Sequence, residues 1–185
     1  MNAPEAGYTN RWISSKLKGA ERKRLVAYMG LVAGVGFVFS AFELLNYELP
    51  DPYTTAIFAI LGIISFNTPI RLAPKVHIHA TWPILFPGLY CYGLPLAILT
   101  GVPSVLSQAV FLSKPWLAAM FNAGQLAISL GLADITIQCV RGITPYTITY
   151  EIIGLVVAMI IFDLCNITLV SIAVSKERQE KWQGC

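Results

Sequence analysis

Long apolar segments separated by short polar ones dominate this sequence and restrict what it can fold into. A helix needs about 20 predominantly apolar residues to cross the hydrocarbon core of a bilayer. The 185 residues are 56% hydrophobic and only 12% charged, about half the charge of an ordinary soluble domain. We therefore predict an all-α, polytopic integral membrane protein with about six transmembrane helices. The predicted spans are residues 25–45, 53–68, 79–100, 105–112, 116–140 and 147–174.

The positions of the basic residues predict how these spans are oriented. Cytoplasmic loops of membrane proteins collect Lys and Arg. If both termini are cytoplasmic, all but one of the 13 Lys and Arg residues lie on the cytoplasmic side, and the exception is Arg141. The Trp residues then fall at or beyond the inner ends of the spans and several Tyr residues at the outer ends, as expected for side chains that favour interfaces. The prediction is a multi-pass protein of the cell inner (plasma) membrane.

This topology divides the chain into three segments and excludes several classes of protein. Residues 1–24 form a basic segment, expected either to lie on the inner leaflet as a helix or to be solvated; 25–175 form the transmembrane domain and 176–185 a cytoplasmic tail. The net charge of +3 comes from residues that orient helices, so we expect no binding to nucleic acid. No catalytic motif is present, so we expect a non-enzyme, and the sequence assigns no cofactor.

Histidine and cysteine give no metal-site pattern. The four Cys residues lack CxxC spacing, which favours small buried hydrophobes over a disulfide framework or a metal site. His77 and His79 form an HxH pair without a nearby acidic or Cys cluster, and we interpret them as interface residues. We therefore predict no metal.

Ionisable residues inside a bilayer cost about 2.5–3.5 kcal/mol each near a helix centre, so they mark candidate sites. Asp134, Gln138 and Arg141 follow i, i+4, i+7 spacing and share one helical face. The predicted outer site consists of Glu43, Asn46, Asp134, Gln138, Arg141 and Glu151. Two interpretations stay open: an acidic, partly apolar cup for a small cationic or amide-bearing ligand, or an ion pair of Arg141 with Asp134 or Glu151 that closes the bundle.

Other polar and small residues lie deeper in the predicted spans. Asp163 is costly at the middle of the sixth span, so we consider it as a ligand or proton-coupling residue. Together with Asp134 and Glu151 it would also be the basis of an unassigned membrane enzyme, the alternative to a non-enzyme. Interhelical hydrogen bonds and small-residue contacts commonly hold membrane helices together. The predicted packing residues are Gly30, Gly34, Asn122, Gln125 and Asn166.

One stretch carries a resemblance to a known family. Residues 121–129, FNAGQLAIS, follow a Lys-Pro-Trp step and precede a turn that contains Gly142. This pattern resembles the FN-x-x-Q helix in the membrane-embedded N-terminal sensory region of bacterial HD-GYP and GGDEF signalling proteins, and the resemblance covers residues 77–142. It implies a multi-helix module that senses something in the membrane and signals to a cytoplasmic output domain. Because the chain stops where that domain would begin, we expect an isolated domain, a fragment or a protein that acts through a partner.

The size, the six spans and the outward polar cup are also similar to the substrate-binding S component of energy-coupling-factor vitamin transporters. That resemblance implies a vitamin bound from outside and a separate coupling protein docked at Gly30 and Gly34. The function expected first is a non-catalytic membrane module for ligand sensing or for coupling to partner proteins. The alternatives are the S subunit of a vitamin or small-molecule transporter, or a structural subunit of a larger membrane complex. The expected partners are the lipid bilayer, a protein partner or a second copy of the chain, and a small-molecule ligand.

Overall fold

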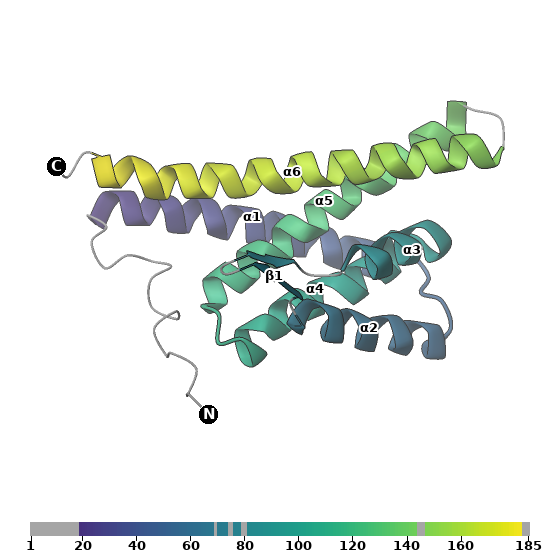
Figure 1. Cartoon of the computed structure of the whole chain (residues 1–185), viewed down its shortest axis with the longest axis horizontal. Coiled ribbons are helices and arrows are strands. Elements are labelled where there is room, and N and C mark those ends of the chain that lie inside the picture. The colour runs from purple at the N-terminus through teal and green to yellow at the C-terminus, as the bar shows by residue number, and fades with distance from the viewer. Residues whose placement is uncertain (1–18, 69, 74–75, 79–80, 144–146, 183–185) are drawn as a thin grey trace.

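The computed structural model describes residues 19–68, 70–73, 76–78, 81–143 and 147–182. The described residues form six helices and one two-stranded hairpin (Figure 1). The elements are α1 Gly19–Asn46, α2 Pro52–Asn67, β1 Ile70–Ala73, β2 Val76–Ile78, α3 Trp82–Tyr92, α4 Leu94–Phe111, α5 Trp116–Ile143 and α6 Ile148–Trp182. The predicted helical fold class is confirmed. Most of the basic segment 1–24, His79 and the last three residues of the tail lie outside the described residues.

Four helices are long and apolar enough to cross a membrane. Their apolar segments are Lys23–Asn46, Leu94–Phe111, Trp116–Ile143 and Ile148–Ser175. Helix α2 is apolar but has 16 residues, which at 1.5 Å per residue is roughly 24 Å and less than the thickness of a bilayer core. Helix α3 has 11 residues, or roughly 16 Å. By length and composition four helices of the described chain could therefore span a membrane, and two of the six predicted spans correspond to shorter helices.

The boundary between two helices lies at Gly93, and this differs from the helix boundaries that we predicted within residues 79–112. We expected a proline-broken span at 79–100 and a separate short one at 105–112. Instead, α3 ends at Tyr92, and Gly93 follows with a φ of 85° that is readily adopted only by glycine. Helix α4 then runs unbroken through Pro103. Pro95 sits in the first turn of α4, where a helix does not need the missing N–H. The glycine, rather than the prolines, therefore decides where one helix ends and the next begins.

An unexpected hairpin connects α2 to α3. Strands β1 and β2 are antiparallel, with Ile70 opposite Ile78 and Arg71 opposite His77. His77 of the HxH pair therefore lies in a strand.

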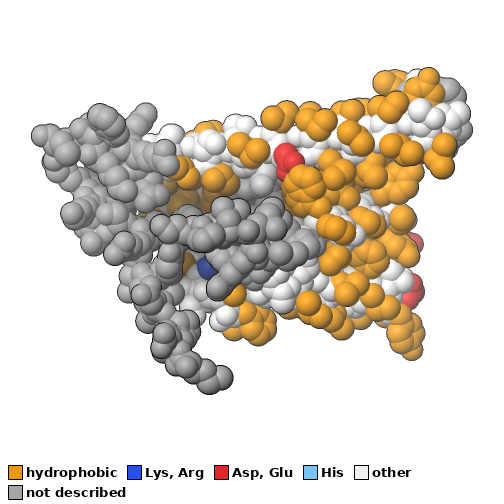
Figure 2. All heavy atoms as spheres, viewed as in Figure 1, with side chains coloured by type: hydrophobic (Ala, Val, Ile, Leu, Met, Phe, Trp, Pro, Cys, Tyr) orange, Lys and Arg blue, Asp and Glu red, His pale blue; other side chains and the backbone are white. Residues whose placement is uncertain are grey.

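Helix α5 occupies the centre of the arrangement. It packs against α1, α3, α4 and α6, while α2 packs mainly on α4. Figure 1 shows α1 and α6 side by side, with α5 crossing between them and the α2–α4 layer; α1 begins and α6 ends at the same end of the molecule. Hydrophobic side chains cover much of the described surface in Figure 2, and Val38 and Leu45 of α1 are 73% and 86% exposed. Such extensive apolar surface marks a face that contacts lipid or another protein.

Helices α1 and α5 approach each other most closely at two glycines. A Cβ atom on Gly36 would lie 2.3 Å from the Cα of Gly124, and one on Gly124 would lie 2.6 Å from the Cα of Ala33. At Gly30 and Gly34 an added Cβ would meet nothing within 4 Å. The predicted close approach at these two residues is therefore not made with any other described residue. Gly36 is two positions after Gly34, roughly 200° around the helix, so the small-residue spacing identified the right helix but the wrong face.

We predict that Gly36→Ala destabilises the protein by about 1–3 kcal/mol, because the new Cβ has to push α5 away. Gly34→Ala is the matched control. It adds the same methyl group on the open face of the same helix and should leave stability unchanged or raise it by about 0.4–1 kcal/mol. Thermal unfolding in detergent, followed by the loss of the monodisperse peak in size-exclusion chromatography, measures the difference. Equal midpoints for the two variants would contradict the close contact.

Candidate functional site

Three of the predicted outer residues line a small cavity. The cavity has a volume of about 380 Å³ and lies between α1, the α3–α4 bend and α5. Glu43, Glu48 and Asp134 supply carboxylates, and Gln138 donates a hydrogen bond of 2.5 Å to Asp134. Tyr47 lies on the same wall. The structure thus brings Glu43, Asp134 and Gln138 of the predicted outer site together, and the ligand-binding cup stays a prediction.

Two of the remaining predicted outer residues, Arg141 and Glu151, form a separate cluster with Tyr90. The Nε of Arg141 donates to Glu151 Oε2 at 3.1 Å, and the hydroxyl of Tyr90 donates to the same oxygen at 2.6 Å. The guanidinium of Arg141 also lies 4.6 Å from the centre of the Tyr90 ring, within the range of a cation–π interaction. This cluster ties together α3, α5 and α6. Of the pairings left open, the structure forms the one with Glu151.

Two further predicted ligand residues belong neither to the acidic cavity nor to this cluster. Asn46 is exposed and donates a hydrogen bond to the backbone oxygen of Phe42 at 2.7 Å. Asp163 on α6 is half-buried and is absent from the described walls of both cavities. Among the residues that the structure describes, no cluster of three or more His, Cys, Asp and Glu side chains has the arrangement of a metal site.

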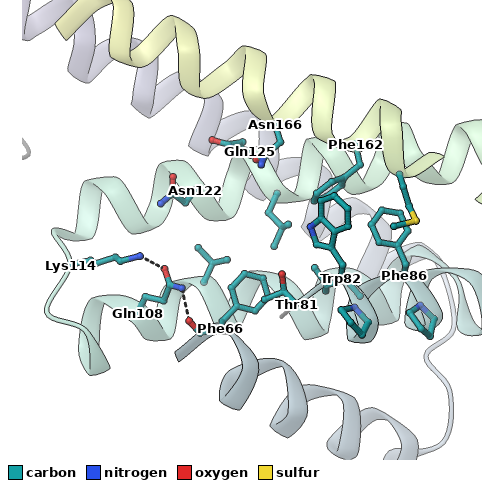
Figure 3. A pocket seen from close by; sticks show the side chains of 16 residues that line it. Phe66, Thr81, Trp82, Phe86, Gln108, Lys114, Asn122, Gln125, Phe162 and Asn166 are labelled. Carbon is teal, nitrogen blue, oxygen red and sulfur yellow. Dashed lines mark hydrogen bonds between the residues drawn. The ribbon is translucent and has the colours of Figure 1, made fainter. Parts of the chain in front are cut away.

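A larger cavity of about 970 Å³ lies between α3, α4, α5 and α6. Figure 3 shows three zones along it: Lys114 at one end, the amides of Asn122, Gln125 and Asn166 in the middle, and aromatic rings at the other end. We name it the inner cavity, because Lys114 belongs to the loops that the charge pattern predicts to be cytoplasmic.

Local backbone geometry places Lys114 at the charged end. Helix α4 ends at Phe111, and Ser113 then adopts a φ of 50°, a left-handed conformation that costs an L-residue about 1–2 kcal/mol. The turn directs the Lys114 ammonium back to Gln108, whose Oε1 accepts its hydrogen bond at 2.8 Å. Gln108 in turn donates to the backbone oxygen of Phe66 at 2.8 Å.

The charge of Lys114 is poorly compensated. Burial lowers the pKa of the Lys114 ammonium below its usual value. Its hydrogen-bond partner, Gln108, is neutral, and the one ion pair among the described residues joins Arg141 and Glu151. The result is a cation held beside a cavity without a carboxylate partner in the described part of the chain.

The middle zone contains the residues predicted to pack α5 against α6. Gln125 donates from Nε2 to Oδ1 of Asn166, so the predicted interhelical bond is formed. Gln125 is only 4% exposed, yet its Oε1 has no hydrogen-bond partner among the described residues. A buried acceptor left unpaired costs about 1–3 kcal/mol. Asn122 adds a third amide to the wall.

Three aromatic rings form the far end. The ring centres of Trp82 and Phe86 are 6.3 Å apart, those of Trp82 and Phe162 are 6.5 Å apart, and those of Phe86 and Phe162 are 5.5 Å apart. All three pairs have steep interplanar angles, the edge-to-face geometry that aromatic rings prefer.

Sequence reasoning missed the charged and aromatic ends of this cavity. It interpreted Lys114 as a topological charge and Trp82 as an interface residue. Gln108 offered a signal, because it is a polar residue inside an apolar segment. The contact with Phe66 is 42 positions away in sequence, so no helical spacing reveals it.

The chain matches no protein-family model, and no curated protein or solved structure is significantly similar to it. The resemblances to bacterial sensory regions and to vitamin-transporter S components therefore stay predictions.

The outer cluster predicts energetic coupling between Arg141 and Glu151. In a double-mutant cycle with Arg141→Met and Glu151→Gln, we expect an interaction energy of about 0.5–3 kcal/mol, because each change removes the same contact. The cycle is measured as unfolding stability in detergent. The matched control pairs Arg141→Met with Asp163→Asn, a carboxyl on the same helix as Glu151 but 12 residues further along, roughly 18 Å, and this pair should be nearly additive. Additive effects at Arg141 and Glu151 would mean that the ion pair does not hold the helices together.

Proposed function

We propose that this chain is a non-catalytic membrane module that binds a small molecule in its inner cavity and passes the bound state through α6 to a partner on the cytoplasmic side. One observation carries the proposal. Helix α6 supplies Met159, Phe162 and Asn166 to the cavity wall and then continues without a break to Trp182. A single rigid element therefore connects the cavity with the region beyond the apolar span.

The length of α6 supports this role. Its apolar part is 28 residues long, roughly 42 Å, and the complete helix has 35 residues, roughly 52 Å. A bilayer core is about 30 Å thick. The last turns are polar, with the sequence KERQEKW at 176–182. A helix of this length has room to present a polar end outside the bilayer.

We further propose that the chain crosses the inner membrane six times, with both termini in the cytoplasm. The helices alternate in direction in Figure 1, and the start of α1, the α4–α5 connection and the end of α6 share one end. Lys23, Arg24 and Lys114 belong to that end, which is the distribution that cytoplasmic loops favour. The short helices α2 and α3 would then cross with part of their connections.

The outer acidic cavity favours one second candidate, the substrate-binding subunit of a transporter. Glu43, Glu48 and Asp134 face a cavity of about 380 Å³, which suits a small cationic or amide-bearing molecule. In that case the open face of α1 at Gly30 and Gly34 would be available to a coupling partner or a second copy. Loss of a copurified molecule in Asp134→Asn, with retention in inner-cavity variants, would favour this candidate over the first.

The proposed function predicts that filling the inner cavity removes bound material. We expect native mass spectrometry of the protein in mild detergent to show a copurified species in the wild type. It should be absent from Asn122→Trp, whose new ring occupies the cavity. Leu132→Trp is the matched control, because Leu132 is 40% exposed on the same helix and should retain the species. A wild type without bound material would contradict the proposal.

Coupling through α6 is measured separately with two spin labels. The labels are placed at Arg24→Cys on α1 and Ser175→Cys on α6, both exposed, in a protein whose own cysteines are replaced. We expect the distance distribution to differ before and after delipidation in the wild type and to be the same in Asn122→Trp. An unchanged distribution in the wild type would mean that the cavity does not communicate with the end of α6.

A further inference from the structure

Resting on the proposed function, we infer that the ligand of the inner cavity is an anionic amphiphile. Its acidic group pairs with Lys114, a hydroxyl or amide N–H next to that group binds Gln125, and its apolar body ends against Trp82, Phe86 and Phe162. Each part of this assignment follows from one zone of the cavity in Figure 3.

The acidic group follows from the charge of the lining. Lys114 is the one ionisable side chain among the described lining residues. It uses one of its three N–H donors on Gln108, which leaves donors for a ligand. Charge-assisted hydrogen bonds are roughly twice as strong as neutral ones. A cationic ligand would be repelled here, and a neutral one would leave the ammonium uncompensated.

The hydrogen-bond donor follows from the middle zone. The Oε1 of Gln125 is a buried acceptor without a partner in the described part of the chain. A carboxylate or phosphate has no proton to offer, so this acceptor needs a different group on the ligand. In Figure 3 it lies between Lys114 and the aromatic rings. The donor therefore belongs between the acidic group and the apolar body, as in a monoacylglycerol phosphate or a hydroxylated fatty acid.

The orientation of the cavity fits a molecule taken from the inner leaflet. Lys114 lies in the α4–α5 connection, outside both helices. On α6, Asn166 is nine residues before Ser175, or roughly 13 Å deeper, and Phe162 is roughly 20 Å deeper. The cavity therefore turns from charged to apolar in the same direction as the leaflet itself. Its volume of about 970 Å³ falls at the upper end of the range of ligand pockets, about 300–1,000 Å³.

The test uses Trp82 as the reporter. A variant in which Trp12, Trp116 and Trp182 are replaced by Phe keeps Trp82 alone, and dibromostearate quenches its fluorescence by contact. We expect saturable quenching that unbrominated competitors reverse by displacing dibromostearate. Monooleoylglycerol phosphate should displace it at a lower concentration than oleate, and oleate at a lower concentration than uncharged monoolein. A variant that keeps only Trp116, which is 59% exposed, reports on lipid at the surface and should show no saturable quenching.

Lys114 provides the matched substitutions. Lys114→Gln should weaken the binding of both acids by about tenfold or more and leave the binding of monoolein unchanged. Lys114→Arg should retain the preference for acids over monoolein. Monoolein competing as well as the acids, or unchanged acid binding in Lys114→Gln, would overturn the ligand assignment. Equal binding of oleate and monooleoylglycerol phosphate would overturn the hydrogen-bond donor that we assign to Gln125.

Failure of this assignment is distinguishable from failure of the proposed function. If the spin-label distances still respond to delipidation while acids show no advantage, the module senses a ligand of another class. If acids bind at Trp82 while the distances do not respond, the ligand class stands and the signalling role of α6 fails.

Discussion

The close contact between Gly36 and Gly124 is the constraint on which the rest of the arrangement depends. Because two backbones meet there, α5 is drawn against α1 and fixed at the centre of the fold. Gln125 is the next residue on α5, about 100° around the helix, and from there it reaches Asn166 on α6. A larger residue at either glycine would move the helix that carries the middle zone of the inner cavity. In a bilayer, where helices gain little from hydrophobic burial against each other, such close packing is a principal source of association energy.

The sequence was informative about spans and weak about contacts between them. Length and hydropathy located α1, α5 and α6, because each is a long apolar segment with polar flanks. The same signal misplaced the boundary near Gly93, since Pro95 in the first turn of α4 and Pro103 in its interior both leave that helix unbroken. Helical spacing placed Asp134 and Gln138 correctly on one face, and charge sorting singled out Arg141. No local pattern could show that Gln108 bonds to Phe66, because that contact depends on how α2 packs against α4.

The two polar regions make different contacts with α6. Near the start of α6, Arg141, Glu151 and Tyr90 connect α3, α5 and α6 with charged hydrogen bonds, which hold those helix ends together. Further along, α6 faces a cavity over Phe162 and Asn166. A helix has more room to move where it faces open volume than where it is bonded to its neighbours. Under the proposed function, this asymmetry directs the effect of a ligand to the segment that leaves the bilayer.

The inner cavity also explains why an occupied state would differ in energy from an empty one. An unpaired buried acceptor at Gln125 and an uncompensated ammonium at Lys114 both destabilise the protein when nothing satisfies them. A ligand that satisfies both groups binds the arrangement in which they face the cavity better than one in which they turn to water. A ligand shifts a conformational equilibrium only by its difference in affinity for the two states. Under the proposed function, the two polar groups that only a ligand would satisfy are therefore the source of that difference.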